Sequence, residues 1–181
     1  MLSYPLTPTA EMRTLEPWNA EEFAAFIAEH RKHLAEYLPW AAALTDVDQT
    51  RAWLQRYAES AARDEGRIYG IWLDGRLAGG TLFRVFETRF STAEIGVWLA
   101  PGAVGQGLVT RAATRMIDWV IRDRGMHRVE WRTFPENERS IAVAERLGMH
   151  LDGTLREAFP YNGVNHDALV YSLLSHEWLA R

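Results

Sequence analysis

The 181-residue sequence predicts a single domain of mixed α+β class. Segments rich in β-branched and aromatic residues alternate with segments of helical periodicity, in the order β, α, α, β, β, β, α, β, α, β, β. This order contains too few strict β-α-β units for a doubly wound parallel sheet. No internal repeat, low-complexity tract or linker interrupts residues 1–181, so we expect one domain throughout.

The first third of the chain predicts one strand and two helices. The strand covers Met12–Glu16, and Asn19 with Glu22 three residues later resembles a capping box at the start of the first helix. The apolar residues of this helix are Phe23, Phe26, Ile27 and Leu34. The second helix begins after Thr45-Asp46, ends near Asp64-Glu65-Gly66, and carries Trp53, Leu54 and Tyr57 toward the core.

The remainder of the chain predicts six strands and two helices. The strands are Ile68–Leu73, Leu77–Phe86, Thr92–Leu99, Val129–Phe134, Leu151–Phe159 and Asp167–Leu174. The first two strands are separated by Asp74-Gly75, which is a signal for a type I′ turn, and the last two by Asn162-Gly163. The helices run from about Gly107 to Arg124 and from Asn137 to Leu147.

The composition excludes several classes of protein. Having no cysteine excludes disulfide scaffolds, thiolate metal sites and a cysteine nucleophile. The net charge of −4 argues against a nucleic-acid binder and is easier to reconcile with a cationic partner. His30 and His33 have no evident third ligand, so we expect no metal. With no signal peptide and no apolar run near the ~18 residues of a membrane span, we expect a cytoplasmic protein without a membrane partner.

The segment Gly102–Thr110 joins a predicted strand to a predicted helix. Gly105 and Gly107 allow a ligand to approach the backbone closely, and the first turn of the helix directs N–H groups and partial positive charge at the loop. A pyrophosphate suits this arrangement. An ordinary turn before a helix can have the same spacing of glycines, so this spacing alone does not establish a ligand site. A dinucleotide site fits less well, because the loop follows several strands and Thr110 replaces the third glycine of that motif.

Several motifs, in order over roughly residues 10–175, resemble the GNAT superfamily of N-acetyltransferases and its RimJ/RimL-type branch. The family loop, Arg/Gln-x-x-Gly-x-Gly/Ala, corresponds to Val104–Val109, where Val104 and Val109 depart from the pattern. The other matching segments are Leu38-Pro39-Trp40, Glu94-Ile95-Gly96-Val97-Trp98-Leu99, Asn137–Met149, Gly153-Thr154-Leu155-Arg156-Glu157 and Asn162–Leu174.

The resemblance implies a central, mostly antiparallel twisted sheet of about seven strands flanked by about four helices. It also implies transfer of an acetyl group from acetyl-CoA to a primary amine. The loop would bind the pyrophosphate, and the strand around Val97 would pair with the pantetheine arm and polarise the thioester carbonyl. The implied acetyl-CoA-binding residues are Val97, Trp98, Leu99, Val104, Gly105, Gln106, Gly107, Leu108, Val109, Thr110, Asn137 and Ser140.

The predicted catalytic residues are Glu94 and Ser140. An alkylammonium has a pKa near 10 and must lose a proton before it attacks, so Glu94 is the candidate base, acting directly or through water. The alternatives for Glu94 are that it is an exposed residue of the strand or that it forms an ion pair with an arginine. Ser140 matches a serine of the family, and the resemblance implies that its hydroxyl protonates the leaving thiolate. Asn137 can cap its helix, and the resemblance implies that it also binds the pantetheine amides. Trp40, Phe83 and Glu94 are the candidate acceptor-binding residues.

The identity of the acceptor stays open. Members of the family acetylate protein N-termini or amines of antibiotics, peptides and polyamines, and fold alone does not determine which. With no cysteine, we expect direct attack by the amine in a ternary complex. A resistance acetyltransferase acting on an antibiotic amine and a non-catalytic acyl-CoA sensor are the alternatives. A homodimer is a further expectation, since the family often dimerises.

Overall fold

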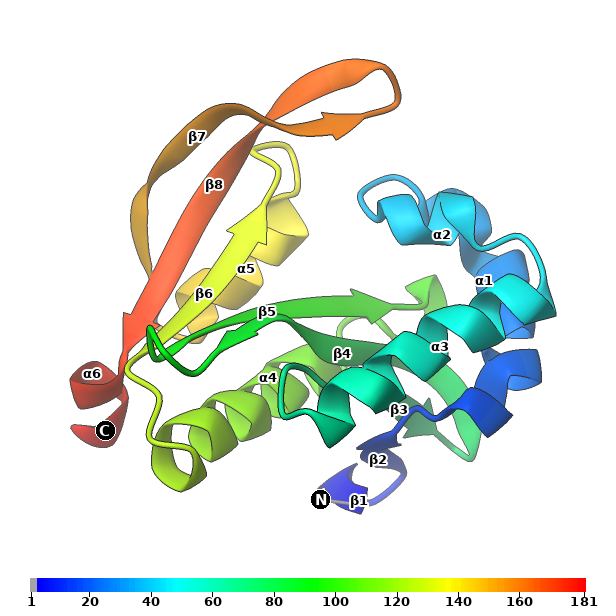
Figure 1. The fold of residues 1–181 in the computed structure, drawn as a ribbon, viewed down its shortest axis with the longest axis horizontal. Helices are drawn as coiled ribbons and strands as arrows, with labels where there is room; N and C mark the ends of the chain where they lie inside the picture. Colours follow the sequence, from blue (N-terminus) through cyan, green and yellow to red (C-terminus); the bar gives the residue numbers. More distant parts are fainter. Residues whose placement is uncertain (1–2) are drawn as a thin grey trace. The chain divides into compact units, whose positions relative to one another are not determined.

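The computed structural model describes residues 3–181 (Figure 1). Within them, eight strands form one mixed, mostly antiparallel sheet in the order β1-β2-β3-β4-β5-β6-β8-β7, with six α-helices. The strands are β1 (Ser3–Thr7), β2 (Ala10–Thr14), β3 (Ile68–Leu73), β4 (Arg76–Glu87), β5 (Thr92–Leu99), β6 (Arg128–Thr133), β7 (His150–Tyr161) and β8 (Val164–Leu174). The helices are α1 (Ala20–Leu34), α2 (Pro39–Ala43), α3 (Val47–Ala62), α4 (Leu108–Asp118), α5 (Glu138–Arg146) and α6 (Ser175–Leu179).

The described chain divides into two compact units, one made of residues 3–83 and Val97–Ala112, the other of Arg84–Gly96 and Ala113–Arg181. Strands β4 and β5 and helix α4 each contribute residues to both units. The expectation of one domain over residues 1–181 stays a prediction.

The first unit packs α1, α2 and α3 around an aromatic core. Its antiparallel strands β1 to β4 follow each other in the sheet in chain order. Phe23 on α1 is fully buried, and its ring lies 5.8 Å from the Trp53 ring of α3 and 6.0 Å from the Trp98 ring of β5. The apolar face predicted for the first helix therefore lies in the core, as do Trp53 and Leu54.

Two adjacent glycines in β4 make room for β5 in this unit. A Cβ at Gly79 would stand 2.5 Å from the Trp98 carbonyl oxygen, and one at Gly80 would meet the Trp98 ring and the Tyr69 carbonyl oxygen. Both contacts are closer than side chains tolerate, so only glycine fits. The Trp98 indole can enter the core because these positions carry no side chain.

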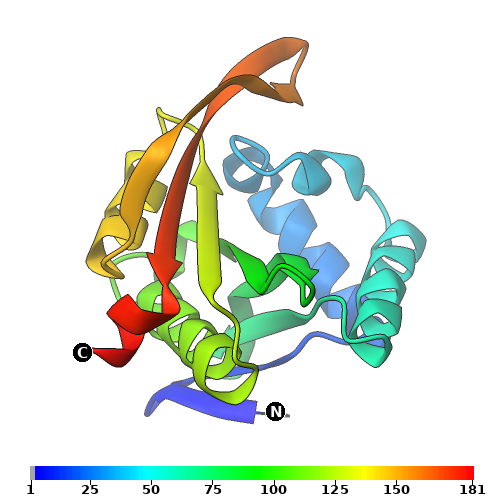
Figure 2. The same ribbon diagram turned by 60° about the vertical axis from the view of Figure 1, so that its left-hand side comes forward.

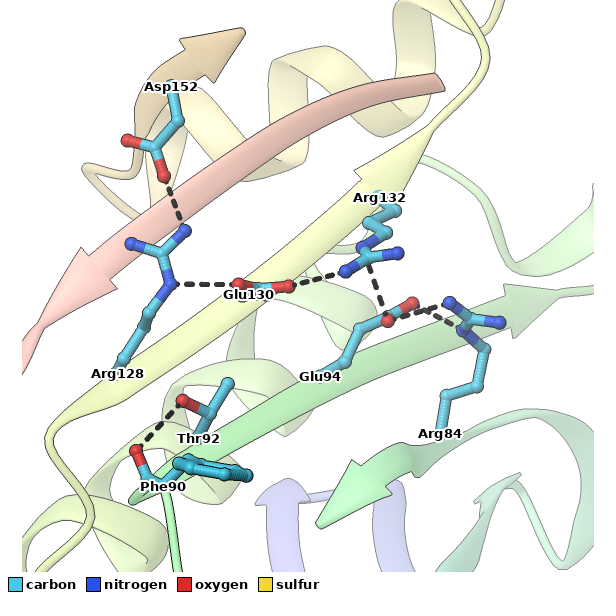
Figure 3. A network of polar contacts seen from close by, with 8 residues as sticks. All are labelled: Arg84, Phe90, Thr92, Glu94, Arg128, Glu130, Arg132 and Asp152. Carbon is cyan, nitrogen blue, oxygen red and sulfur yellow. Dashed lines mark hydrogen bonds and ion pairs between the residues drawn. The ribbon is translucent and has the colours of Figure 1, made fainter. Parts of the chain in front are cut away.

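The second unit is built on β6, β8 and β7, which pair antiparallel, and on the start of β5, which pairs parallel with β6. Side chains alternate along β6: Val129 and Trp131 are buried, whereas Arg128, Glu130 and Arg132 belong to the opposite face. Trp131 contacts Ser140 of α5, so this helix covers the buried face. The charged face remains for polar contacts (Figure 3).

Strands β7 and β8 form a long hairpin that extends beyond the end of β6 (Figures 1 and 2). Its turn residues Asn162 and Gly163 both have positive φ, as a type I′ turn requires. Asp74 and Gly75 in the β3–β4 hairpin share this feature, which confirms the type I′ turn predicted there. Most of β7 is exposed on both faces.

The structure corrects several sequence predictions. Strand β1 and the short helices α2 and α6 were missed, so about seven strands and four helices become eight and six in the described residues. The long helix ends at Asp118 and continues as a π-helical turn, Trp119–Asp123. The capping box at Asn19 is wrong: the Asn19 side chain accepts from the Glu16 N–H, and Glu22 accepts instead from the Trp72 indole at 2.9 Å.

Among residues 3–181, no helix is long and apolar enough to cross a membrane.

We predict that Gly80→Ala lowers the free energy of unfolding by about 2 kcal/mol, because the new methyl group must displace the buried Trp98 ring. Urea unfolding measures this change. Gly102→Ala is the matched control: an added Cβ there meets nothing within 4 Å, so its effect stays within about 0.5 kcal/mol. Equal stability of the two variants would contradict the packing argument.

Candidate active site

The loop before α4 has an open, exposed backbone. Gly105 and Gly107 have φ of 86° and 71°, in the left-handed region, and a Cβ built at either meets nothing within 4 Å. Val104, Gly105, Gln106 and Gly107 are exposed, whereas Leu108 is buried and anchors the helix. Val109 and Thr110 are half-buried in the first turn of α4. Such a loop can bring its N–H groups against an anion.

The part of β5 in the first unit has one buried and two half-buried side chains. Trp98 is buried in the aromatic core, and Val97 and Leu99 flank it. Any contact that Trp98 makes with a ligand would therefore come from its backbone. The Ala100 N–H donates to the Ala78 carbonyl at 2.7 Å, which ties the end of β5 to β4.

The two aromatic candidates for acceptor binding differ in burial. Phe83 is only 1% exposed, so its ring is a core residue with almost no surface to offer an acceptor. Trp40 is half-buried, and its ring meets Trp98 edge-to-face at 5.4 Å. Arg31 of α1 holds the segment that carries Trp40, donating to the carbonyls of Ala41 at 2.5 Å and Leu44 at 2.9 Å.

In the second unit, the parallel pairing of β5 with β6 is short. It joins Thr92–Glu94 to Arg128–Glu130, and within the described residues it ends there, although β6 continues to Thr133. Glu94 is thus the last residue of β5 that pairs with β6. Arg132, two residues past the last pair on β6, reaches back with Nε 3.4 Å from Glu94 Oε2.

Glu94 is a buried carboxylate held by two guanidinium groups. Arg84 of β4 donates from Nε to Oε1 at 2.5 Å and from Nη2 to Oε2 at 2.8 Å, and Arg132 approaches from the other side (Figure 3). The Glu94 side chain is only 4% exposed. We call this arrangement of Arg84, Glu94 and Arg132 the clasp. It shows that Glu94 pairs with arginines, one of the alternatives considered from the sequence.

The charged face of β6 extends the clasp into a chain of alternating charges. Arg132 also donates to Glu130 at 3.0 Å, and Arg128 bridges Glu130 and Asp152. Burial acts to raise the pKa of Glu130, but hydrogen bonds from Arg128 and Arg132 outweigh it and lower this pKa. The hydrogen bond from Arg128 likewise lowers the pKa of Asp152. Both carboxyls are therefore favoured in their charged form.

Asn137 and Ser140 lie together at the start of α5. The Asn137 side chain accepts from the Ser140 N–H at 3.1 Å, which confirms the predicted helix cap. The buried Trp131 indole donates to Ser140 Oγ at 2.9 Å. Because the hydroxyl oxygen is already an acceptor, its proton is available to another partner. Asn137 and Ser140 are both half-buried.

Sequence reasoning missed Arg84, Arg132, Arg31 and the Trp131 indole. A signal for Arg132 existed, since Arg128, Glu130 and Arg132 alternate along one strand and must share a face. Arg84 carries no such signal, because its contact with Glu94 depends on how two strands meet. In residues 3–181, no group of three or more His, Asp or Glu side chains is placed to hold a metal ion.

Comparison with known proteins identifies relatives that cover most of the chain. The model of the acetyltransferase (GNAT) domain family matches residues 13–150. YdaF of Bacillus subtilis, named provisionally as a ribosomal N-acetyltransferase, is 32% identical over 92% of both chains. The ribosomal-protein-serine acetyltransferase of Escherichia coli is 24% identical over 92% of this chain and 93% of its own length.

Solved structures share the fold. RimL, the acetyltransferase of the α-amine of ribosomal protein L7/L12, was solved with coenzyme A and superposes with a TM-score of 0.90 at 24% identity, covering 95% of this chain and 97% of its own. The microcin C7 self-immunity acetyltransferase MccE, in complex with acetyl-CoA and AMP, has a TM-score of 0.87 at 25% identity over 93% and 94% of the two chains.

We predict that Arg128→Gln destabilises the protein near neutral pH by about 1 kcal/mol, a modest value because Asp152 is partly exposed. The pKa values of Glu130 and Asp152 are lowered in the folded protein, so their stabilisation is present above the ordinary values of 4.5 and 3.8 and lost as the pH falls through the lowered ones. The difference between Arg128→Gln and the parent should therefore shrink in acid.

Chemical unfolding at a series of pH values measures this difference. Arg156→Gln, at an exposed position of β7, serves as the control and should show no such trend. A destabilisation by Arg128→Gln that stays constant down to acid pH would contradict the proposed ion pairs.

Proposed function

The chain belongs to the GNAT acetyltransferase family, and on that premise we propose that it transfers the acetyl group of acetyl-CoA to the α-amine of a protein N-terminus. The observation that carries the proposal is the match to YdaF, which extends over 92% of both chains at 32% identity. The names of that relative, of the E. coli ribosomal-protein-serine acetyltransferase and of RimL all point to ribosomal-protein acceptors.

The loop before α4 supports binding of acetyl-CoA as a substrate. Its exposed backbone and the open space at Gly105 and Gly107 fit a pyrophosphate, which needs N–H donors and no intruding side chain. Val104 and Val109 do not alter this fit, because the contacts come from the backbone of the segment Val104–Thr110. Structural neighbours were solved with coenzyme A and with acetyl-CoA.

The strand and helix residues have complementary tasks in the proposal. The backbone of Val97 and Leu99 pairs with the pantetheine arm, and the N–H groups around Val97 and Trp98 polarise the thioester carbonyl. The Asn137 side chain binds a pantetheine amide. The Ser140 hydroxyl, whose oxygen accepts from Trp131, donates its proton toward the leaving sulfur.

The chemistry requires one proton to leave the amine. Its lone pair attacks the thioester carbon, the C–S bond breaks, and the thiolate takes up a proton. Glu94 receives the proton of the amine. Its carboxylate has about four lone-pair sites, and three contacts with Arg84 and Arg132 leave about one. Because the side chain is 4% exposed, we propose that a water molecule relays the proton.

This geometry favours an α-amine over a polyamine. An α-amine has a pKa near 8 and is partly neutral at physiological pH, whereas an alkylamine has one near 10 and needs a stronger base. Three contacts with Arg84 and Arg132 leave the Glu94 carboxylate about one lone-pair site for a proton, so an amine that is already partly neutral suits this site better. Trp40, half-buried beside Trp98, is the candidate to line the acceptor.

Two other classes of acceptor, polyamines and antibiotics, are also represented among the similar proteins. The E. coli spermidine N(1)-acetyltransferase is 27% identical over 63% of this chain, and MccE is a self-immunity acetyltransferase for microcin C7.

The expected homodimer also remains a prediction.

We predict that acetyl-CoA and CoA raise the melting temperature of the protein, and that NAD and NADP do not. With acetyl-CoA, peptides beginning with serine or alanine should release CoA thiol and gain one acetyl group at the α-amine, measured by mass spectrometry. Peptides with a blocked N-terminus and an internal lysine are the control. Acetylation of spermidine but of no peptide would overturn the proposed acceptor, and thermal stabilisation without turnover would indicate a sensor.

We predict that Glu94→Gln lowers kcat by about 100-fold or more, because an amide cannot take the proton, and leaves the KM for acetyl-CoA unchanged. Steady-state thiol release measures both constants. Glu130→Gln is the matched control, since it removes a second carboxylate of the same network, and it should retain kcat within a few-fold. An equal loss in both variants would remove Glu94 as the base.

A further inference from the structure

We propose that Arg84 and Arg132 make the enzyme select acceptors that carry an acidic side chain near the reacting amine, and disfavour polycationic ones. This inference deepens the proposed function and rests on it, because it takes Glu94 to lie beside the acceptor. It runs opposite to the hint of a cationic partner that the net charge of −4 provides.

The charges of the clasp are unequally exposed. The acidic side chains are covered, with Glu94 4% and Glu130 14% exposed. The basic side chains are open, with Arg84 49% and Arg132 37% exposed. Both arginines are paired with Glu94, from positions on either side of it (Figure 3), and their side chains remain partly exposed. A molecule that approaches the Glu94 end of the network therefore meets cations.

Short-range contacts decide which acceptor benefits. A carboxylate of the acceptor can accept hydrogen bonds from an exposed guanidinium, and such charge-assisted bonds are about twice as strong as neutral ones. An ammonium cannot reach the covered carboxylates, and it loses hydration beside two positive charges. The exposed Asp152 does not compensate, because it lies at the other end of the chain of charges and pairs with Arg128.

The side chains of Arg84 and Arg132 are also fixed in position before any acceptor binds. Arg84 forms a two-bond contact with Glu94, and Arg132 is fixed between Glu94 and Glu130. A side chain that is already ordered loses little further entropy on binding, so its preference for an anion appears in the affinity. The same bonds keep the carboxylates paired, so removing either arginine affects Glu94 as well as the acceptor.

The test uses hexapeptides that begin with serine and differ only at positions two and three, which carry aspartate, asparagine or lysine. The quantity measured is the ratio of kcat/KM for the aspartate and lysine peptides within each variant. This ratio cancels any loss of turnover that a variant causes through Glu94. In the parent at low salt we expect a ratio of about tenfold, which falls as salt rises because exposed charges are screened.

Arg84→Gln and Arg132→Gln should lower the ratio to about threefold or less, and Arg84→Lys should keep it, because lysine retains the positive charge. Arg128→Gln is the matched control. It removes an arginine with two ion pairs in the same network but no contact with Glu94, and its ratio should equal that of the parent.

Three results would overturn the inference: equal rates for the aspartate and lysine peptides, an unchanged ratio in both glutamine variants, or an equal fall in Arg128→Gln. Acetylation of all the peptides at similar rates would retain the proposed function and remove only the charge selection. Acetylation of spermidine but of none of the peptides would remove both.

Discussion

A buried carboxylate between two arginines, Glu94 between Arg84 and Arg132, is the interaction on which the second unit depends. Burial of a lone carboxylate is costly, and its pairing with two guanidinium groups offsets this cost, so loss of either partner would leave a buried charge less well compensated. The contacts join β4, β5 and β6 at the residue where the parallel pairing of β5 with β6 ends. Side chains thus hold the two strands where backbone hydrogen bonds no longer do.

The same interaction limits the chemistry. In the proposed reaction, a carboxylate that already accepts three contacts has about one lone-pair site left for a proton, so it suits an amine that is partly neutral without help. A protein α-amine meets that condition better than a polyamine. In our proposal, the partly exposed Arg84 and Arg132 side chains are the charges that an acceptor meets, although the protein as a whole is acidic. Local exposure, rather than net charge, is the relevant quantity.

The proposed acetyl-CoA contacts depend on different constraints in each unit. In the first unit, the constraint is the absence of side chains at glycines. Gly79 and Gly80 leave room for the Trp98 backbone and ring, and Gly105 and Gly107 leave the loop backbone open. In the second unit, polar side chains are fixed by their neighbours. The Trp131 indole N–H donates to the Ser140 hydroxyl oxygen, which orients the hydroxyl and satisfies the only polar atom of the buried indole. Asn137 accepts from the Ser140 N–H and so caps the first turn of α5.

Local chemistry was readable from the sequence alone. The type I′ turn at Asp74-Gly75, the turn at Asn162-Gly163 and the cap at Asn137 depend on neighbouring residues, and family motifs indicated the acetyltransferase fold. Contacts between distant segments were decided only by the tertiary structure. Glu22 caps nothing because Trp72, fifty residues away, engages its carboxylate. Arg84 and Arg132 reach Glu94 only once three strands lie side by side, since no periodicity within one segment encodes how strands meet.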